Sequence, residues 1–210
     1  MKIQRSTFNL LLFIYSLSLI YIYTFATQPS NVQTDQKIND IRKKYLYSVS
    51  SYEYTDNYDV LNYQIDLKIF PEEEEIHGKT TIQLKILESS IDRIYFNFSG
   101  LDIDSVSGSY SQSTFTEESE FIIINFAQQL VLNDTISITI YYHGSPARGI
   151  YFIDNLYNTR VVYSHNEPFD ARYWFPCKDD PSDKAFAELF ICLPEDYHVL
   201  SNGLLMGETY

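Results

Sequence analysis

The side chains best suited to chemistry lie in one segment, residues 163–184, between two strand-like runs. Acids, bases, aromatic residues, prolines and a cysteine follow each other closely there. A loop that only had to be soluble would not contain Tyr173, Trp174 and Phe175 in succession. A core strand would not contain so many charges. Mixed segments of this kind form either a functional site or a buried polar network.

Glu167 is the strongest single candidate for function in this segment. It follows the strand-like run 160–163 and comes directly before Pro168. A carboxylate in mainly aromatic surroundings can bind an ammonium group through charge-assisted hydrogen bonds. The residues alone leave an alternative open, in which Glu167 forms a structural ion pair with Arg172 or another base.

The other charged residues of the segment are interpreted as structural. We expect Asp170 and Arg172 to form a local salt bridge that clamps the loop. We expect Asp179, Asp180 and Lys184 to form a turn with a charged network, because the proline after Asp180 restricts the backbone there. The three successive aromatic residues are expected to belong to the core.

Several functional classes are excluded by composition and motifs. The net charge is −13, whereas nucleic-acid binding needs a basic surface that neutralises phosphates. The four histidines form no His-Glu-x-x-His zinc motif, and no glycine-rich phosphate loop or Gly-x-Ser-x-Gly motif occurs. We therefore predict no metal ligand and no catalytic residue within these 210 residues.

Outside residues 163–184 the hydrophobic pattern after residue 55 is almost entirely that of strands. Apolar and polar residues alternate over 63–69 and again over 76–86, which is typical of half-buried strands. Further strand-like runs are expected at 93–98, 103–106, 121–126, 135–142, 160–163, 185–193 and 198–200. Turn residues separate these runs. Many short strands with regular turns predict an all-β fold, an antiparallel sandwich or open barrel.

The N-terminus has the pattern of an export signal. Two basic residues precede an apolar run over residues 8–25, and Thr24 and Ala26 supply small residues before a cleavage site. We expect residues 1–26 to be a cleaved signal peptide, with a retained N-terminal anchor as the alternative. Residues 27–55 are polar and are interpreted as a linker or N-terminal arm. Either way, the remainder of the chain is expected to be exported.

Export would place the two cysteines in an oxidising compartment. A disulfide between Cys177 and Cys192 would stabilise the fold by roughly 3 kcal/mol, and the alternative is two buried thiols that pack as small apolar groups. Two glycosylation sequons are also present, Asn97-Phe-Ser and Asn133-Asp-Thr.

One long segment resembles a known family. Residues 167–185 read Glu-Pro-Phe-Asp-Ala-Arg-Tyr-Trp-Phe-Pro-Cys-Lys-Asp-Asp-Pro-Ser-Asp-Lys-Ala. This is similar to the signature Glu-Pro-x-Asp-Ala-Arg-x-x-Phe-Pro-Cys-x-Asp-Glu-Pro-x-x-Lys-Ala of zinc aminopeptidases of the aminopeptidase N type. Asp180 stands where that family usually has Glu. Residues 58–69, 76–82 and 199–203 resemble its first two strands and its Val-x-Ser-Asn-Gly turn.

The resemblance covers residues 56–210 and implies the family's N-terminal domain, a saddle-like all-β sandwich before a thermolysin-like catalytic domain. In that family the position matching Glu167 is Glu or Gln, reaches into the active site and helps to bind the free α-amine of the substrate. The position of His165 is usually Gln, so His165 is a weaker candidate for a substrate contact.

The resemblance also implies which parts of the enzyme these residues do not contain. The family's Gly-x-Met-Glu-Asn motif and its zinc-binding helix would lie beyond Tyr210. We therefore expect the substrate-positioning domain of an exported zinc aminopeptidase, inactive alone and incomplete at its last strands. Its expected partners are the downstream catalytic domain, which would hold the zinc, and a peptide substrate. The alternative is a stand-alone exported β-sandwich that binds a ligand and has no peptidase activity.

Overall fold

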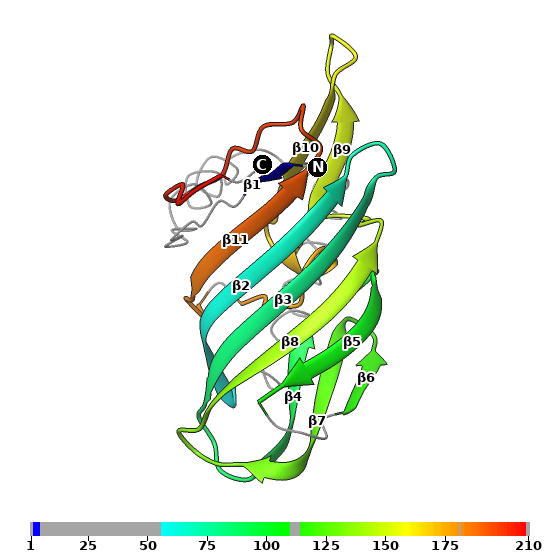
Figure 1. Ribbon diagram of the computed structural model, residues 1–210. Helices are drawn as coiled ribbons and strands as arrows, with labels where there is room; N and C mark the ends of the chain where they lie inside the picture. The colour runs from blue at the N-terminus through cyan, green and yellow to red at the C-terminus, as the bar shows by residue number, and fades with distance from the viewer. Residues whose placement is uncertain (1, 5–55, 110–113, 181, 209–210) are drawn as a thin grey trace, which may run out of the picture.

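The computed structural model describes residues 2–4, 56–109, 114–180 and 182–208 (Figure 1). The described residues form strands and one short 3-10 turn, which confirms the all-β prediction. The elements are β1 (Lys2–Gln4), β2 (Tyr58–Phe70), β3 (Glu75–Ile86), β4 (Ile91–Asn97), β5 (Asp102–Gly108), β6 (Thr114–Glu118), β7 (Phe121–Leu130), β8 (Thr135–Gly144), β9 (Ile150–Asp154), β10 (Arg160–Ser164), the 3-10 turn η2 (Ala171–Tyr173) and β11 (Phe186–Leu193).

The predicted export signal and arm fall almost entirely outside the described residues. Only Lys2–Gln4 is described, as the short strand β1 beside β11. Within the described ranges, no helix is both long enough and apolar enough to cross a membrane. The apolar run 8–25 lies outside those ranges.

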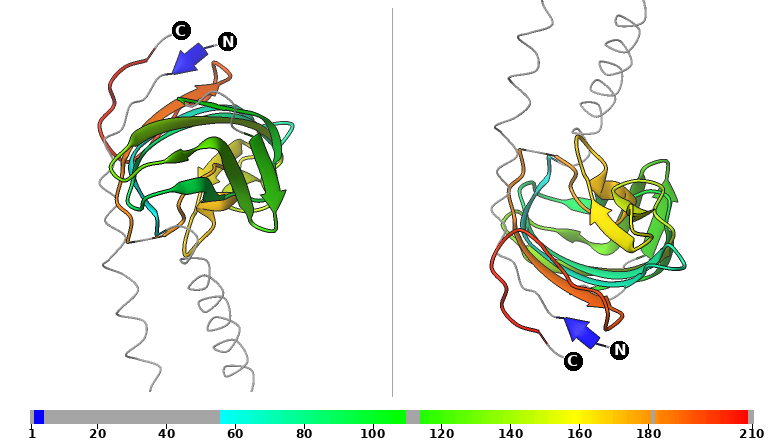
Figure 2. Two further views of the ribbon diagram at one scale, coloured as in Figure 1. Left: turned by 90° about the horizontal axis from the view of Figure 1, so that it is seen from below. Right: turned by 90° about the horizontal axis from the view of Figure 1, so that it is seen from above.

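The strands form three sheets. The largest has six strands in the order β1-β11-β2-β3-β8-β5, and a second has the order β4-β7-β6. The hairpin β9–β10 forms the third. Figure 2 shows the six-stranded sheet as a curved layer, with the other strands on its inner side. The core therefore lies between the large sheet and the three-stranded sheet.

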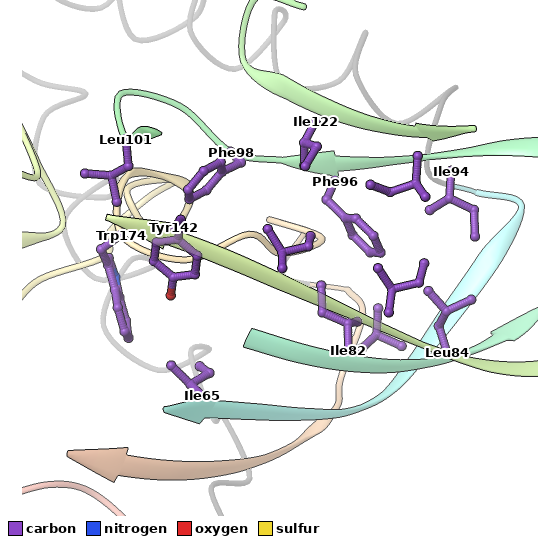
Figure 3. Packing of buried hydrophobic residues seen from close by; sticks show 14 of the residues in the cluster. Ile65, Ile82, Leu84, Ile94, Phe96, Phe98, Leu101, Ile122, Tyr142 and Trp174 are labelled. Carbon is purple, nitrogen blue, oxygen red and sulfur yellow. The ribbon is translucent and has the colours of Figure 1, made fainter. Parts of the chain in front are cut away.

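Strand alternation explains which side chains fill this core. Successive side chains of a strand point to opposite faces, so every second residue of β3 and β8 points inward. Isoleucines dominate this inner face, and aromatic rings join them from both sheets (Figure 3). Fully buried members include Tyr58, Ile76, Ile82, Leu84, Ile94, Phe96, Ile122, Ile124 and Ile140. The outer face of β3 carries mainly polar and charged residues, and that of β8 carries Thr, Ser, Tyr and His.

The sheet differs from the predicted antiparallel arrangement at one pairing. β11 lies parallel to β2, with Phe186 opposite Asn62. A parallel pair needs a long crossover connection, and everything from β3 to η2 lies between these two strands. The predicted strand 198–200 does not form, and residues 198–200 have no regular secondary structure. No described strand lies beside them as a pairing partner. The structure adds β6 and β9, which the pattern of apolar residues did not identify.

Candidate functional site

Glu167 lies in a short turn directly after β10, where the chain leaves the hairpin β9–β10. Its side chain is exposed, as is that of His165. Among the described residues, no side chain forms an ion pair or hydrogen bond with the Glu167 carboxylate. The alternative of an ion pair with Arg172 does not hold, because Arg172 binds Glu120 and Asp179 instead. The Glu167 carboxylate is therefore exposed and has no partner within the described ranges.

Three hydrogen bonds hold the turn that carries Glu167. The indole Nε1–H of Trp174 donates to Asn166 Oδ1 at 2.8 Å, and the Asp170 N–H donates to the Asn166 carbonyl at 3.0 Å. On the other side, the N–H of His165 donates to the carbonyl of Gly149 at 2.8 Å. Trp174 is itself buried in the core. Its hydrogen bond therefore holds in place the backbone that carries the exposed Glu167 carboxylate.

Gly149 makes this packing possible. Its φ is +81°, a conformation that L side chains rarely adopt. A Cβ atom placed there would lie 2.3 Å from the carbonyl oxygen of Asp170 and 2.6 Å from Cδ1 of Trp174. The chain entering β9 therefore touches the backbone of the Glu167 turn, and only glycine fits between them.

Arg172 is the centre of a buried ionic network below this turn. Its Nε lies 2.9 Å from Asp179 Oδ2, and its Nη1 lies 2.8 Å from Glu120 Oε2. The N–H of Asp179 donates to Asn97 Oδ1 at 3.0 Å. These contacts join η2 and the segment after it to β4 and to Glu120, in the turn between β6 and β7. The network is a structural clamp that holds the loop onto the three-stranded sheet.

Burial and pairing compete in this network. Burial disfavours the charged guanidinium and is the largest single influence, but the charges and hydrogen bond of the neighbouring groups, Asp179 first among them, together outweigh it, so the pKa of Arg172 is raised. Burial raises the pKa of the Asp179 carboxyl above its ordinary value, and Arg172 offsets part of that rise. Both side chains are nearly inaccessible to water, so each depends on the other for its charge.

The expected salt bridge between Asp170 and Arg172 does not form, because each residue pairs with another partner. Asp170 Oδ1 lies 3.5 Å from Arg148 Nη1, while Arg172 reaches across to Asp179. Asp170 directly precedes η2 and Arg172 lies within it, and each forms its ion pair with a different part of the structure. Both residues form ion pairs, but not with each other.

The predicted network of Asp179, Asp180 and Lys184 is only partly formed. Asp179 belongs to the Arg172 clamp, and Asp180 Oδ1 accepts a hydrogen bond from the N–H of Ser182 at 2.8 Å, as in an Asx turn. Lys184 is exposed and has no ionic partner among the described residues. It does not belong to the described network.

Sequence reasoning missed a second buried pair, Lys178 and Asp183. Their charged atoms are 2.7 Å apart, and both side chains are almost fully buried. Lys178 Nζ also donates to the carbonyl of Tyr58, and its N–H donates to the Tyr63 hydroxyl. Burial raises the pKa of Asp183, and Lys178 offsets part of this rise. The sequence shows Lys178 between Cys177 and Asp179, but it gives no sign that this lysine is buried.

The two cysteines are free thiols in this structure. Cys177 is buried beside Asn97, whose backbone pairs with it in both directions. Cys192 lies in β11 opposite Lys68 and lines a shallow groove of about 400 Å³ on the large sheet. Of the two alternatives from sequence, the structure supports thiols over a disulfide.

Cys177 should resist alkylation in the native chain. Burial raises the pKa of its thiol well above the ordinary value, and the Asp179 charge adds to this, so the reactive thiolate is scarce. With iodoacetamide at pH 8, we expect modification of Cys177 only after urea is added, whereas the half-buried Cys192 reacts earlier. Peptide mass spectrometry distinguishes the two sites. Equal native rates for both cysteines would contradict this packing.

Among the described residues, no three His, Cys, Asp or Glu side chains are grouped so that they could hold a metal ion. The zinc that the sequence resemblance implies therefore has no fitting ligand set in this part of the chain. What the described part offers is a fixed, exposed carboxylate on an all-β scaffold.

This combination defines a class of protein: an all-β domain with a signature loop clamped between its sheets. Residues 59–209 match the model of the peptidase M1 N-terminal domain, and the chain belongs to this family. Aminopeptidase M1-D of Oryza sativa subsp. japonica is 29% identical over 131 residues. That match covers 60% of this chain and 14% of the rice protein.

Solved structures have the same fold. An M1 zinc metallopeptidase from Deinococcus radiodurans superposes with a TM-score of 0.58 at 21% identity, over 74% of this chain and 39% of that one. Yeast LTA4 hydrolase superposes with a TM-score of 0.60 at 22% identity, over 73% of this chain and 27% of that one. This chain thus spans less than half the length of each of these relatives.

Proposed function

We propose that this chain is the substrate-positioning N-terminal domain of an exported zinc aminopeptidase, and that Glu167 binds the free α-amine of a peptide. The observation that carries the proposal is the Glu167 carboxylate, which is exposed, unpaired among the described residues and fixed by its turn. A carboxylate that has no partner among the described residues, and whose backbone is held in place, can pair with a positively charged group of a ligand. The matching ligand group is an ammonium.

The fixed turn matters as much as the charge. Substrate-positioning groups act by holding a reactant in one orientation, and small misplacements reduce the rate strongly. The bonds from Trp174 and Gly149 to the residues around Glu167 supply this rigidity. The chemistry that the zinc would supply, hydrolysis of the first peptide bond, would belong to a downstream catalytic domain. Within this chain the task is binding and orientation.

We further propose that the catalytic domain docks beside this turn, on the hairpin β9–β10. The hairpin, whose second strand leads into the Glu167 turn, exposes apolar side chains along its strands and at its tip, where a soluble loop would carry polar residues. Its exposed members are Ile153, Leu156, Tyr157, Val161 and Tyr163. The rings of Tyr151 and Tyr163 stack 5.2 Å apart and stiffen the strands. A partner seated there would bring its reacting atoms near the Glu167 carboxylate.

Replacing Glu167 tests the proposal. In the longest natural polypeptide that contains this chain, Glu167→Gln should raise KM for a free-amine aminoacyl substrate by about 10- to 100-fold. A charge-assisted hydrogen bond contributes about 1.5–3 kcal/mol, and Gln keeps the shape but removes the charge. Steady-state kinetics with a fluorogenic aminoacyl amide measures the change.

Glu118→Gln is the matched control, because Glu118 is another exposed carboxylate, on β6. It should leave KM unchanged. Urea unfolding of both variants separates a binding defect from a folding defect. If Glu167→Gln binds the substrate as the parent protein does, Glu167 is not the amine anchor.

A further inference from the structure

The two sequons of this chain lie in opposite structural settings. Asn97 is 4% exposed, at the end of β4. Its Oδ1 accepts a hydrogen bond from the Asp179 N–H at 3.0 Å, and its backbone pairs with Cys177 at 2.8 and 3.1 Å. Its Nδ2 is buried as well. A sugar on that nitrogen would have to occupy space that the Arg172 clamp already fills.

Asn133 is exposed, in the tight connection between β7 and β8. Its φ is +72°, a left-handed conformation that Asn tolerates in turns. Its backbone N–H donates to the carbonyl of Ile86 at 2.9 Å, so the backbone is fixed. No described residue binds its side-chain amide. The third sequon residue, Thr135, is also exposed.

Three exposed apolar residues lie close to Asn133 in the chain or beside its hydrogen-bond partner Ile86. Leu87 is 45% exposed, Val131 is 56% exposed and Leu132 is 45% exposed. Val131 and Leu132 directly precede Asn133, and Leu87 follows the Ile86 carbonyl that Asn133 contacts. In Figure 1 this β7–β8 connection lies at the end of the molecule opposite the hairpin β9–β10. A group attached there would not obstruct the Glu167 turn.

We propose that Asn133 is an N-glycosylation site and that its glycan covers the apolar cluster of Leu87, Val131 and Leu132. The proposal rests on the proposed export. In the transfer, the Nδ2 of Asn133 attacks the anomeric carbon of a lipid-pyrophosphate-linked oligosaccharide. The N–C bond forms, the C–O bond to the pyrophosphate breaks, and the amide proton leaves to a base of the transferase. Asn97 remains unmodified in the folded protein.

The experiment expresses the full chain in secretory eukaryotic cells in two forms, with its own leader and with an established signal sequence in place of residues 1–26. Digestion with an amide-cleaving glycosidase is followed by gel mobility and peptide mass spectrometry. We expect one glycan per chain, at Asn133. Asn133→Gln and Thr135→Ala should both abolish the mobility shift. Thr135→Ser, which keeps the sequon, should retain it.

The two forms separate the site from the export. If the chain with the established signal is secreted without a glycan at Asn133, the site proposal is overturned. A folded, secreted product with its glycan at Asn97 would also overturn it. If the glycan is found only on the chain with the established signal sequence, Asn133 is confirmed as a site, and the proposed export by residues 1–26 is contradicted. Dye binding tests whether the glycan covers the apolar cluster. The Asn133→Gln variant should bind more of a hydrophobic fluorophore than the glycosylated chain does.

Discussion

Replacing Arg172 by Ala should lower the free energy of unfolding by about 3–5 kcal/mol, the usual loss when one partner of a buried ion pair is removed. The change would leave the carboxylates of Asp179 and Glu120 without their guanidinium. Asp179 is nearly inaccessible to water, so its charge could not be solvated instead. Urea unfolding followed by the fluorescence of Trp174, the single tryptophan of the chain, measures the loss.

Arg93→Ala is the control for Arg172→Ala. Arg93 also forms an ion pair, with Asp92 at 3.2 Å, but both side chains are more than half exposed. Exposed pairs contribute little, so the urea midpoint should barely move. Similar midpoints for the two variants would show that the Arg172 network is not the clamp of the loop.

Gly149→Ala should destabilise the chain by about 3 kcal/mol. A left-handed conformation costs an alanine roughly 1–2 kcal/mol, and forcing a methyl group into packed surroundings costs roughly 1–3 kcal/mol more. The methyl group would meet the backbone oxygen of Asp170, which cannot swing away as a flexible side chain could. The same urea titration gives the value.

Gly100 separates the two contributions. Its φ is +83°, nearly that of Gly149, but a Cβ atom there would meet no atom of the described residues within 4 Å. Gly100→Ala should therefore show only the conformational cost. The difference between the two variants reports the contact between β9 and the Glu167 turn. If both lose the same stability, that contact is looser than the structure indicates.

The strands were predictable because their signal is local. Alternation along 63–69 and 76–86 places one face of each strand in the core, and the structure has β2 and β3 there. Which strands pair is not local information. The parallel contact of β11 with β2 depends on how the whole intervening chain folds back, so no pattern within either strand could reveal it.

The same division applies to the site. The residue types around Glu167 left two hypotheses open, a carboxylate that binds an ammonium group and a structural ion pair, and the structure shows its side chain exposed. The ionic partners could not be predicted, because Glu120, in the turn between β6 and β7, is 52 residues from Arg172 and meets it only in the folded chain. Likewise, a single glycine at position 149 does not indicate in the sequence that the backbone of Asp170 lies against it.

The pairing of β11 with β2 has a kinetic consequence. The partners are separated by roughly 120 residues, so closing this contact requires ordering a very long loop. Contacts of such high sequence separation slow folding. During synthesis, β2 would leave the ribosome with one edge open until β11 follows, and open edges promote aggregation. A chaperone that binds extended apolar segments would therefore find its target in β2.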